Sequence, residues 1–257
     1  MSFFVKENSI VRKIWGKSDT IIFIFAGSAA EFALNKAVDW LYYTGKLPAD
    51  PIGRLFSTVT YARQIVFAEN EAALKAIDQI TAIHAAVESN RQQQIPDWAY
   101  RDVLFMLIHY SIASYELLER KLSLTEKEEV FDVFYRVGAQ MKLTGLPTTF
   151  NEWEIIRQDH LEHNLHHGVF TMDLFDQYKK HLGNFRYQLL LQGQILVVPS
   201  IVNQLLNLGK FSWMRFILPP YQLARKIKLD WVLKSIILPG KYKAQIKDLD
   251  TIPNRSY

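Results

Sequence analysis

The sequence contains no cysteine, and this absence removes several kinds of chemistry at once. Disulfides, thiolate nucleophiles, iron–sulfur clusters and zinc sites built on sulfur all require that side chain. Any metal would therefore be held by histidine, by carboxylates or within a macrocycle. Because a chain without cysteine suits every redox compartment, its location has to be argued from other features.

Long apolar runs are missing as well. The first strongly apolar run, residues 21–30, is followed by Glu31 and is too short to span a bilayer. Residues 189–208 are interrupted by proline and by polar side chains, and residues 1–15 lack the apolar core of a signal peptide. We therefore expect no transmembrane helix and a cytoplasmic location.

No tract of one charge dominates the chain, which has 30 basic and 26 acidic residues and a formal net charge of +4. Nucleic-acid surfaces usually show a denser basic stripe, so we expect no nucleic-acid partner. Lysines do accumulate among apolar residues toward the C-terminus, at Lys210, Lys226, Lys228, Lys234, Lys241, Lys243 and Lys247. This pattern is compatible with a membrane-surface face, but we prefer a solvated helical face.

The residues that are present predict a folded, all-α protein. Of the 257 residues, 49% are apolar and 13% aromatic, enough for a core with room for a cofactor pocket. Apolar periodicity predicts helices over 21–43, 54–67, 71–88, 98–121, 125–142 and 149–167, and a further one from Thr171. We expect one domain over 1–257, with a core over 9–200 and a C-terminal helical extension over 201–257.

Individual residues predict where some of these helices begin and end. Asp50 and Pro51 are typical of an N-cap followed by the first helical residue. Thr125 with Glu128 predicts a capping box. Prolines and glycines at Pro199, Gly209, Pro219-Pro220 and Pro239-Gly240 predict short helices near the C-terminus, and residues 194–198 have strand character.

Two histidines lie in apolar surroundings. His84 follows Ala73, Ile77 and Ile80 at helical spacing, which places it on the apolar face of its helix. His109 lies within another apolar run. A single histidine in such a position can be a core residue bonded to a carbonyl or a metal ligand, and the spacing alone leaves both alternatives open.

Ordered motifs resemble those of the haem-dependent oxygenase family that includes rubber oxygenase and the MpaB-type oxygenases. The segment 50–58 matches Asp-Pro-x-x-Arg-Leu-x-x-Thr, and its helix closes at Phe67. Residues 80–87 resemble an Ile-His-x-x-Val helix, and 104–109 a Trp-x-His stretch with leucine replacing tryptophan. The segment 122–126 matches Leu-Ser-x-x-Glu, and 138–147 a Gly…Gly-x-Pro segment, so the agreement extends over residues 9–168.

The resemblance implies a globin-like core that binds haem b, with His84 as the proximal iron ligand. It places Arg54 and Thr58 on the distal side, toward dioxygen or a haem propionate, and leaves His109 near the pocket. The expected activity is oxygenation of a hydrophobic small molecule by dioxygen.

Three positions depart from the family pattern. Ser57 replaces the lysine that precedes the threonine in rubber oxygenase, and Thr81 and Glu88 replace arginines around the histidine. If those arginines pair with propionates, this chain must use other cations, for which Arg91 and Arg101 are candidates. The departures argue against polyisoprene as the substrate.

Two other functions compete with this one. The altered distal residues are compatible with a non-catalytic protein that binds haem or an apolar ligand on the same fold. Alternatively, a non-haem metal could bind His160, His163 and His167, which would share one face of the helix predicted over 149–167, with Glu162 and His166 on another. Because the pair of Glu-x-x-His motifs of a bundle di-iron site is absent, we prefer a solvated helix end for this cluster.

Overall fold

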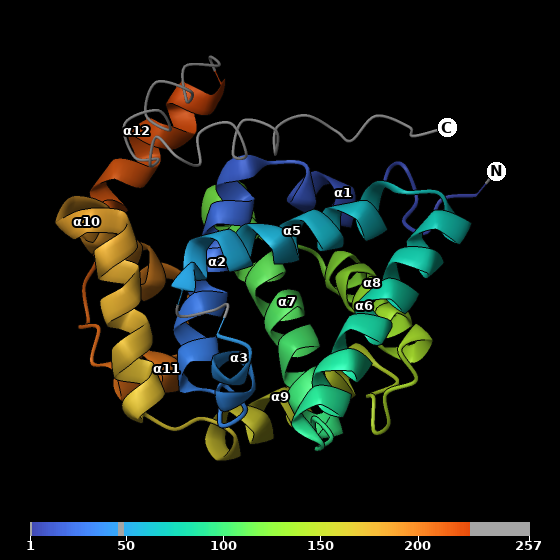
Figure 1. The fold of residues 1–257 in the computed structure, drawn as a ribbon. Coiled ribbons are helices and arrows are strands. Elements are labelled where there is room, and N and C mark those ends of the chain that lie inside the picture. The colour runs from blue at the N-terminus through green and yellow to red at the C-terminus, as the bar shows by residue number, and fades with distance from the viewer. Residues whose placement is uncertain (1, 46–48, 227–257) are drawn as a thin grey trace.

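The computed structural model describes residues 2–45 and 49–226, and every regular element in that part of the chain is a helix (Figure 1). This confirms the all-α prediction. The helices are α1 Ile10–Trp15, α2 Ser18–Leu34, α3 Asp39–Tyr43, α5 Pro51–Phe67, α6 Asn70–Arg91, α7 Asp97–Leu118, α8 Leu124–Gln140, α9 Phe150–His163, α10 Val169–Val197, α11 Ser200–Leu206 and α12 Met214–Lys226.

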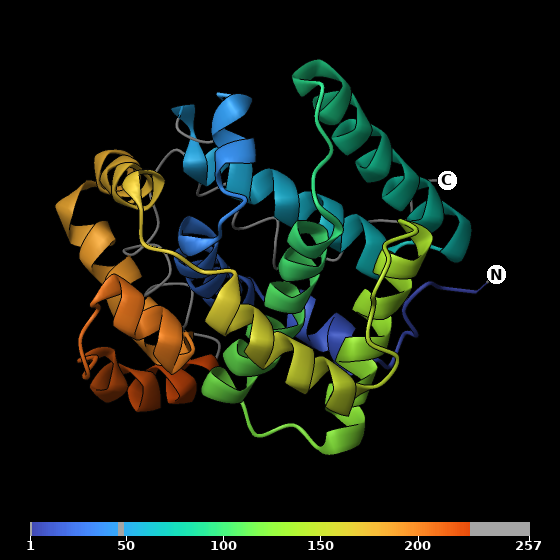
Figure 2. The ribbon, with the colours of Figure 1, turned by 90° about the horizontal axis from the view of Figure 1, so that it is seen from below.

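Helices α2 and α7 pack against each other at the centre of the molecule. On one side α10 and α11 cover α2, and on the other α8 and α9 cover α7 (Figures 1 and 2). Helix α5 runs across one end of this arrangement, and α6 extends from it and contacts α5 and α8. The chain thus forms one all-α domain with α6 at its margin.

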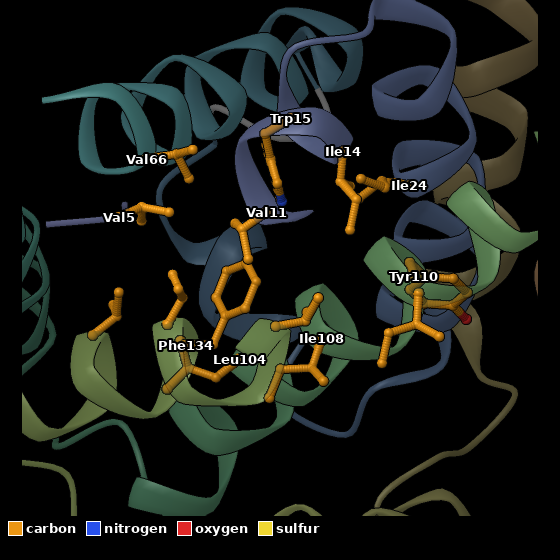
Figure 3. Close-up of a cluster of buried hydrophobic side chains, with 14 of the residues drawn as sticks. Val5, Val11, Ile14, Trp15, Ile24, Val66, Leu104, Ile108, Tyr110 and Phe134 are labelled. Atoms are coloured by element: carbon orange, nitrogen blue, oxygen red, sulfur yellow. The ribbon is translucent and has the colours of Figure 1, made fainter. Parts of the chain in front are cut away.

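The main apolar core lies where α1, α2, α7 and α8 meet (Figure 3). Trp15 is fully buried, and its ring lies 6.2 Å from that of Phe134 on α8. Its indole nitrogen donates a hydrogen bond to Ser111 Oγ at 3.2 Å, which satisfies the only polar atom of that side chain. Ile24 and Ile108 extend the same core toward the middle of α2 and α7.

Two helix starts test the capping predictions. Asp50 is the N-cap of α5, with its carboxylate accepting from the Gly53 N–H at 3.0 Å and Pro51 at the first turn, as predicted. The capping box predicted at Thr125 is wrong by two residues. Ser123 and Glu126 form it instead, because Ser123 is the last extended residue before α8.

The single helix predicted over 21–43 is wrong. Helix α2 ends at Leu34, and Asn35 has extended backbone angles. The Asn35 side chain accepts from the Ala37 N–H at 2.8 Å and donates to Asp102 at 2.7 Å. These bonds replace the helical ones, so a new short helix, α3, starts at Asp39.

Some of the predictions made for residues beyond 193 are wrong. Residues 194–197 belong to α10, so the strand character there was misleading. Pro219 and Pro220 lie inside α12 rather than breaking it. Helix α10 itself bends at Gly183, whose φ of 72° lies in the left-handed region that glycine tolerates. The pair Pro239-Gly240 lies outside the described residues.

None of the helices in residues 2–45 and 49–226 is long and apolar enough to cross a bilayer. The cytoplasmic location stays a prediction from the sequence.

Candidate functional site

One face of α5 carries Arg54, Ser57 and Thr58, as the spacing of three and four predicts. The Arg54 guanidinium donates to Ser57 Oγ at 3.0 Å and to Thr58 Oγ1 at 3.3 Å. Both hydroxyls in turn donate to the backbone carbonyl of Arg54. Burial lowers the pKa of Arg54, yet at neutral pH the side chain remains a cation.

His84 lies on α6 near this cation. Its Nδ1 atom is buried and makes no hydrogen bond of ordinary geometry with a described residue, although the Ile80 carbonyl, one turn earlier on α6, lies close enough to favour the protonated ring. Burial lowers the pKa of His84 and the Arg54 charge lowers it further, while the Ile80 carbonyl and Glu88 act in the opposite direction. The imidazole is therefore neutral at pH 7, which is the state in which histidine binds a metal.

The predicted apolar face of α6 is confirmed in the first half of the helix, where Ala73 and Ile77 are buried. Further along, His84 is half-buried, and the neighbouring Ile83 is 47% exposed on the other side. The ring of Tyr100 on α7 stands edge-on to His84, with 5.2 Å between the ring centroids. His84 thus lies between α5 and the start of α7.

Glu88, one turn beyond His84, has its own role in the fold. Its Oε1 atom accepts the Tyr100 hydroxyl at 3.0 Å and the Ile95 N–H at 2.8 Å. These bonds tie the end of α6 to the connection that leads into α7. At this position, where the resemblance leads one to expect an arginine, the chain has a carboxylate that holds two helices together.

The two arginines considered as substitutes are engaged elsewhere. Arg91 pairs with Asp39 at 2.7 Å and lies over the Trp40 ring, 4.0 Å from its centroid. Arg101 donates to the Thr144 carbonyl at 2.6 Å. Arg54 is thus the cation that the structure brings to His84.

His109 lies in a different part of the molecule. It is nine residues beyond Tyr100 on α7, a rise of about 13 Å along the helix. Burial lowers the pKa of His109 to about 4, and Arg157 lowers it while Glu31 and the Val197 carbonyl oppose the shift. A role for His109 in binding a cofactor stays a prediction.

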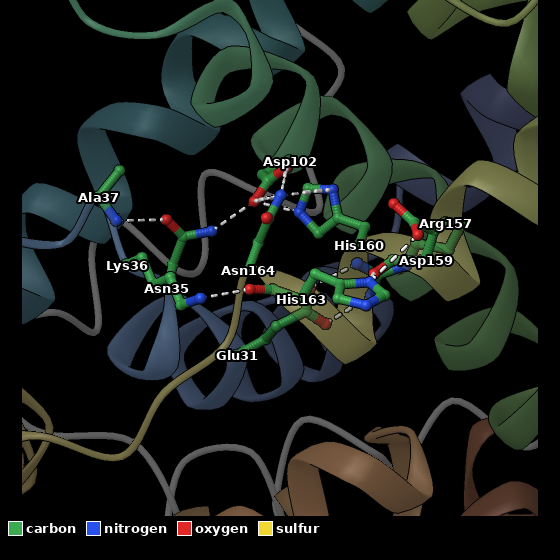
Figure 4. A network of polar contacts seen from close by, with 10 residues as sticks. All are labelled: Glu31, Asn35, Lys36, Ala37, Asp102, Arg157, Asp159, His160, His163 and Asn164. Carbon is green, nitrogen blue, oxygen red and sulfur yellow. Dashed lines mark hydrogen bonds and ion pairs between the residues drawn. The ribbon is translucent and has the colours of Figure 1, made fainter.

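A buried ion pair lies beside His109 and joins α2 to α9. The Arg157 guanidinium donates to both oxygens of Glu31, at 2.5 Å each (Figure 4). The Tyr110 hydroxyl donates to the same carboxylate at 2.8 Å. Burial alone would raise the pKa of Glu31, but Arg157 and Tyr110 bring it below its ordinary value. Arginine and carboxylate groups commonly pair in this bidentate geometry, with two parallel hydrogen bonds.

Asp102, fully buried on α7, is the centre of a second polar group (Figure 4). Its carboxylate contacts Nε2 of His160 and accepts from the side-chain amides of Asn35 and Asn164. Burial lowers the pKa of His160 to about 4, so its ring is neutral. The side-chain amide of Asn164 lies 3.5 Å from the other ring nitrogen, Nδ1.

These contacts decide the alternative based on His160, His163 and His167. Helix α9 ends at His163, so the predicted shared face does not extend to His167. His160 points into the protein toward Asp102, whereas His163 is exposed and pairs with Asp159. Across the described ranges, no group of three potential metal-ligating side chains is assembled.

Comparison with known proteins bears on the site directly. The sequence model of the family described as "ER-bound oxygenase mpaB/B'/Rubber oxygenase, catalytic domain" matches residues 15–227. The chain belongs to this family. No curated protein and no solved structure matches the chain, so the globin-like arrangement of the core stays a prediction.

The motifs that resemble those of the mpaB/rubber oxygenase family imply haem, so the residues of the site are tested against that group. His84 fits, because it is neutral and half-buried, and its buried Nδ1 atom makes no hydrogen bond of ordinary geometry with a described residue. Arg54 fits as the neighbouring cation. At the two positions that depart from the family pattern around His84, Thr81 donates to the Ile77 carbonyl and Glu88 binds Tyr100.

Sequence reasoning missed the two buried polar groups. Glu31 was noticed only as the end of an apolar run, although an acid at helical spacing within buried residues requires a buried partner. Nothing local to the sequence identifies Arg157 as that partner, since 126 residues separate the two.

Proposed function

We propose that the chain is a haem b-dependent oxygenase that acts on a hydrophobic small molecule, with His84 as the proximal ligand. The observation that carries this proposal is the neutral, half-buried His84 beside Arg54, whose buried Nδ1 atom makes no hydrogen bond of ordinary geometry among the described residues, in a member of an oxygenase family. Haem, when bound, supplies the dioxygen chemistry that no side chain can perform.

The residues of the chain have the remaining tasks. His84 would hold the iron of the haem, and burial keeps its ring unprotonated at neutral pH. Arg54 would supply positive charge to the bound group, and Ser57 and Thr58 fix the direction of its guanidinium. Because long side chains lose entropy when they are ordered, a guanidinium that is already fixed costs less to use on binding.

An absorption spectrum tests this proposal. The protein purified after haem supply is expected to show a Soret band, and His84→Ala is expected to lose it. His163→Ala is the matched control, because His163 is exposed on α9 and should leave the band unchanged. A wild-type protein without a Soret band, or an unchanged band in His84→Ala, contradicts the proposal.

A second function, non-catalytic binding of haem or an apolar ligand, is favoured by one observation. The Ser57 and Thr58 hydroxyls are both used within their own helix, as donors to the Arg54 carbonyl. Incubation of the haem-loaded protein with dioxygen, a reductant and candidate alkenes separates the two functions. Oxygen consumption coupled to product formation establishes the oxygenase, and binding without product establishes the second function.

A further inference from the structure

The distribution of charge along the sequence is uneven near the C-terminal end of the described chain. Residues 177–229 contain no aspartate or glutamate, although the whole chain has 26 acidic residues. Eight basic residues lie in the same segment, namely Lys179, Lys180, Arg186, Lys210, Arg215, Arg225, Lys226 and Lys228. The segment includes most of α10 and all of α12, which contact each other (Figures 1 and 2).

One side of α12 is anchored on the body of the protein. Tyr221 donates its hydroxyl to Asp19 at 2.9 Å, and Arg225 pairs with Asp19 at 2.8 Å and with Glu119 at 2.5 Å. Met214 and Leu218 pack against the main core from the same helix. These contacts fix which side of α12 faces outward.

The outward side is apolar, where a helix on a protein surface normally carries polar residues. Phe216 is 74% exposed and Leu223 is 62% exposed, and Trp213 and Ile217 are more than one-third exposed. Their spacing of three, four and seven residues places them on one face. Phe211 adds a further exposed ring, whose centroid lies 5.7 Å from that of Phe216. We call these five residues, at 211, 213, 216, 217 and 223, the α12 face.

The positive charges beside the α12 face indicate what kind of partner binds there. Lys210 and Arg215 are exposed at its border, and the acid-free segment offers them no acidic neighbour in sequence. In a two-fold contact between copies, this face would meet its own positive charge. Residues 227–257 contain six basic and three acidic residues, so they too are cationic. An anionic occupant is the one that complements the face.

We propose that the α12 face docks the protein on the surface of an anionic lipid bilayer. Exposed aromatic and aliphatic side chains on one side of an amphipathic helix enter the boundary between headgroups and acyl chains. Tryptophan favours this boundary, and lysine and arginine beside it are attracted to anionic headgroups. The solvated face preferred from the sequence accounts for the lysines but not for the exposed apolar stripe. The proposal stands independently of haem.

Sedimentation of the full chain with vesicles tests the docking. Vesicles of phosphatidylcholine alone are compared with vesicles that contain about one-third phosphatidylserine, at low and high salt. We expect binding to the anionic vesicles, and weaker binding at high salt. Phe216→Ser/Leu223→Ser should lower the partition by about tenfold or more, because both side chains lose their apolar contact with the lipid.

Two further variants make the result specific. Leu124→Ser/Ile155→Ser removes two side chains that are equally exposed on α8 and α9, and it should bind vesicles as the wild type does. Lys210→Glu/Arg215→Glu should abolish the preference for anionic vesicles. All changes are at exposed positions, and unchanged thermal unfolding verifies that each variant is folded.

Several outcomes overturn the proposal. They are no binding of the wild type to anionic vesicles, equal loss of binding in the Leu124→Ser/Ile155→Ser control, and equal binding by the Phe216→Ser/Leu223→Ser variant. A wild type that is dimeric and does not bind vesicles, beside a monomeric Phe216→Ser/Leu223→Ser variant, also overturns it and assigns the face to a second copy.

Discussion

The ring of Tyr110 on α7 occupies the space beside Gly27 on α2 that a Cβ atom would fill. Tyr110 is fully buried, and its hydroxyl is bonded to Glu31, one turn further along α2. Gly27 therefore sets how closely the two central helices approach. The close approach brings the Tyr110 hydroxyl within reach of the buried carboxylate.

Gly27→Ala is expected to destabilise the protein by about 1–3 kcal/mol, the usual cost of adding volume to a packed core. The Tyr110 ring would have to move, and this movement would strain the hydrogen bond from the Tyr110 hydroxyl to Glu31. Chemical denaturation with urea measures the effect. Gly193→Ala on α10 is the control, because a Cβ there would meet its neighbours at ordinary contact distances of 3.5 Å and more. Equal stability of the Gly27→Ala variant and the wild type contradicts the prediction.

Arg157→Met is expected to lower the free energy of unfolding by about 3–5 kcal/mol, because it leaves Glu31 charged, buried and without its main partner. The double variant Glu31→Gln/Arg157→Met should recover part of this loss, since no uncompensated charge remains. Asp132→Ala breaks an exposed pair with Arg136 on α8 and should change stability by less than about 1 kcal/mol. A double variant less stable than Arg157→Met alone would show that the charge is not the cause.

The sequence predicted well those features that depend on neighbouring residues. Asp50 and Pro51 define the start of α5 because an N-cap acts within three residues. The shared face of Arg54 and Thr58 follows from helical spacing alone, and the hydrogen bonds agree with it. The family resemblance, found in motifs over residues 9–168, is confirmed by the match over residues 15–227.

Features that depend on distant partners were missed. Asn35 ends α2 because its side chain binds Asp102, which lies 67 residues away. His160 lies near other histidines in the sequence, but in the fold it turns inward to the same carboxylate. For residues such as these, the partner that satisfies a buried polar group decides the local structure, and the partner is known only when the fold is known.

Acid should destabilise the protein in a window set by the lowered pKa values of His109 and His160. Burial lowers the pKa of His109 to about 4, below the ordinary value of 6.5. Between these two pKa values the His109 ring is protonated in the unfolded chain but neutral in the folded protein. The contribution of His109 to the free energy of unfolding is therefore complete above pH 6.5 and is lost as the pH falls toward 4. His109→Gln should flatten the stability curve in this window. Urea unfolding at several pH values measures the slope, and an unchanged slope in His109→Gln contradicts the assignment.

Glu31 adds a second acid-sensitive contribution at lower pH. Its folded pKa lies below the ordinary value of 4.5, so its share of stability is present above that value and is lost as the pH falls through the folded pKa. In Glu31→Gln the loss of stability below pH 4.5 should be smaller than in the wild type. A steeper loss in the variant would show that the carboxylate is not ionised in the folded protein.

Substitution of Thr58 tests whether the polar face of α5 contributes to the rate of the proposed oxygenase reaction. Thr58→Val keeps the shape of the side chain but removes one of the two hydroxyl acceptors of Arg54, so the direction of the guanidinium is held by Ser57 alone. We expect turnover of the oxygenase reaction to fall by about 10²-fold, the size of effect seen when one positioned polar group is lost at a reacting centre. The Soret band should remain, because His84 is unchanged. Thr60→Val is the matched control, since Thr60 lies on the exposed side of the same helix and bonds only to the Phe56 carbonyl among the contacts described. Equal turnover in both variants would remove Thr58 from the reaction and leave it the role of a surface hydroxyl on α5.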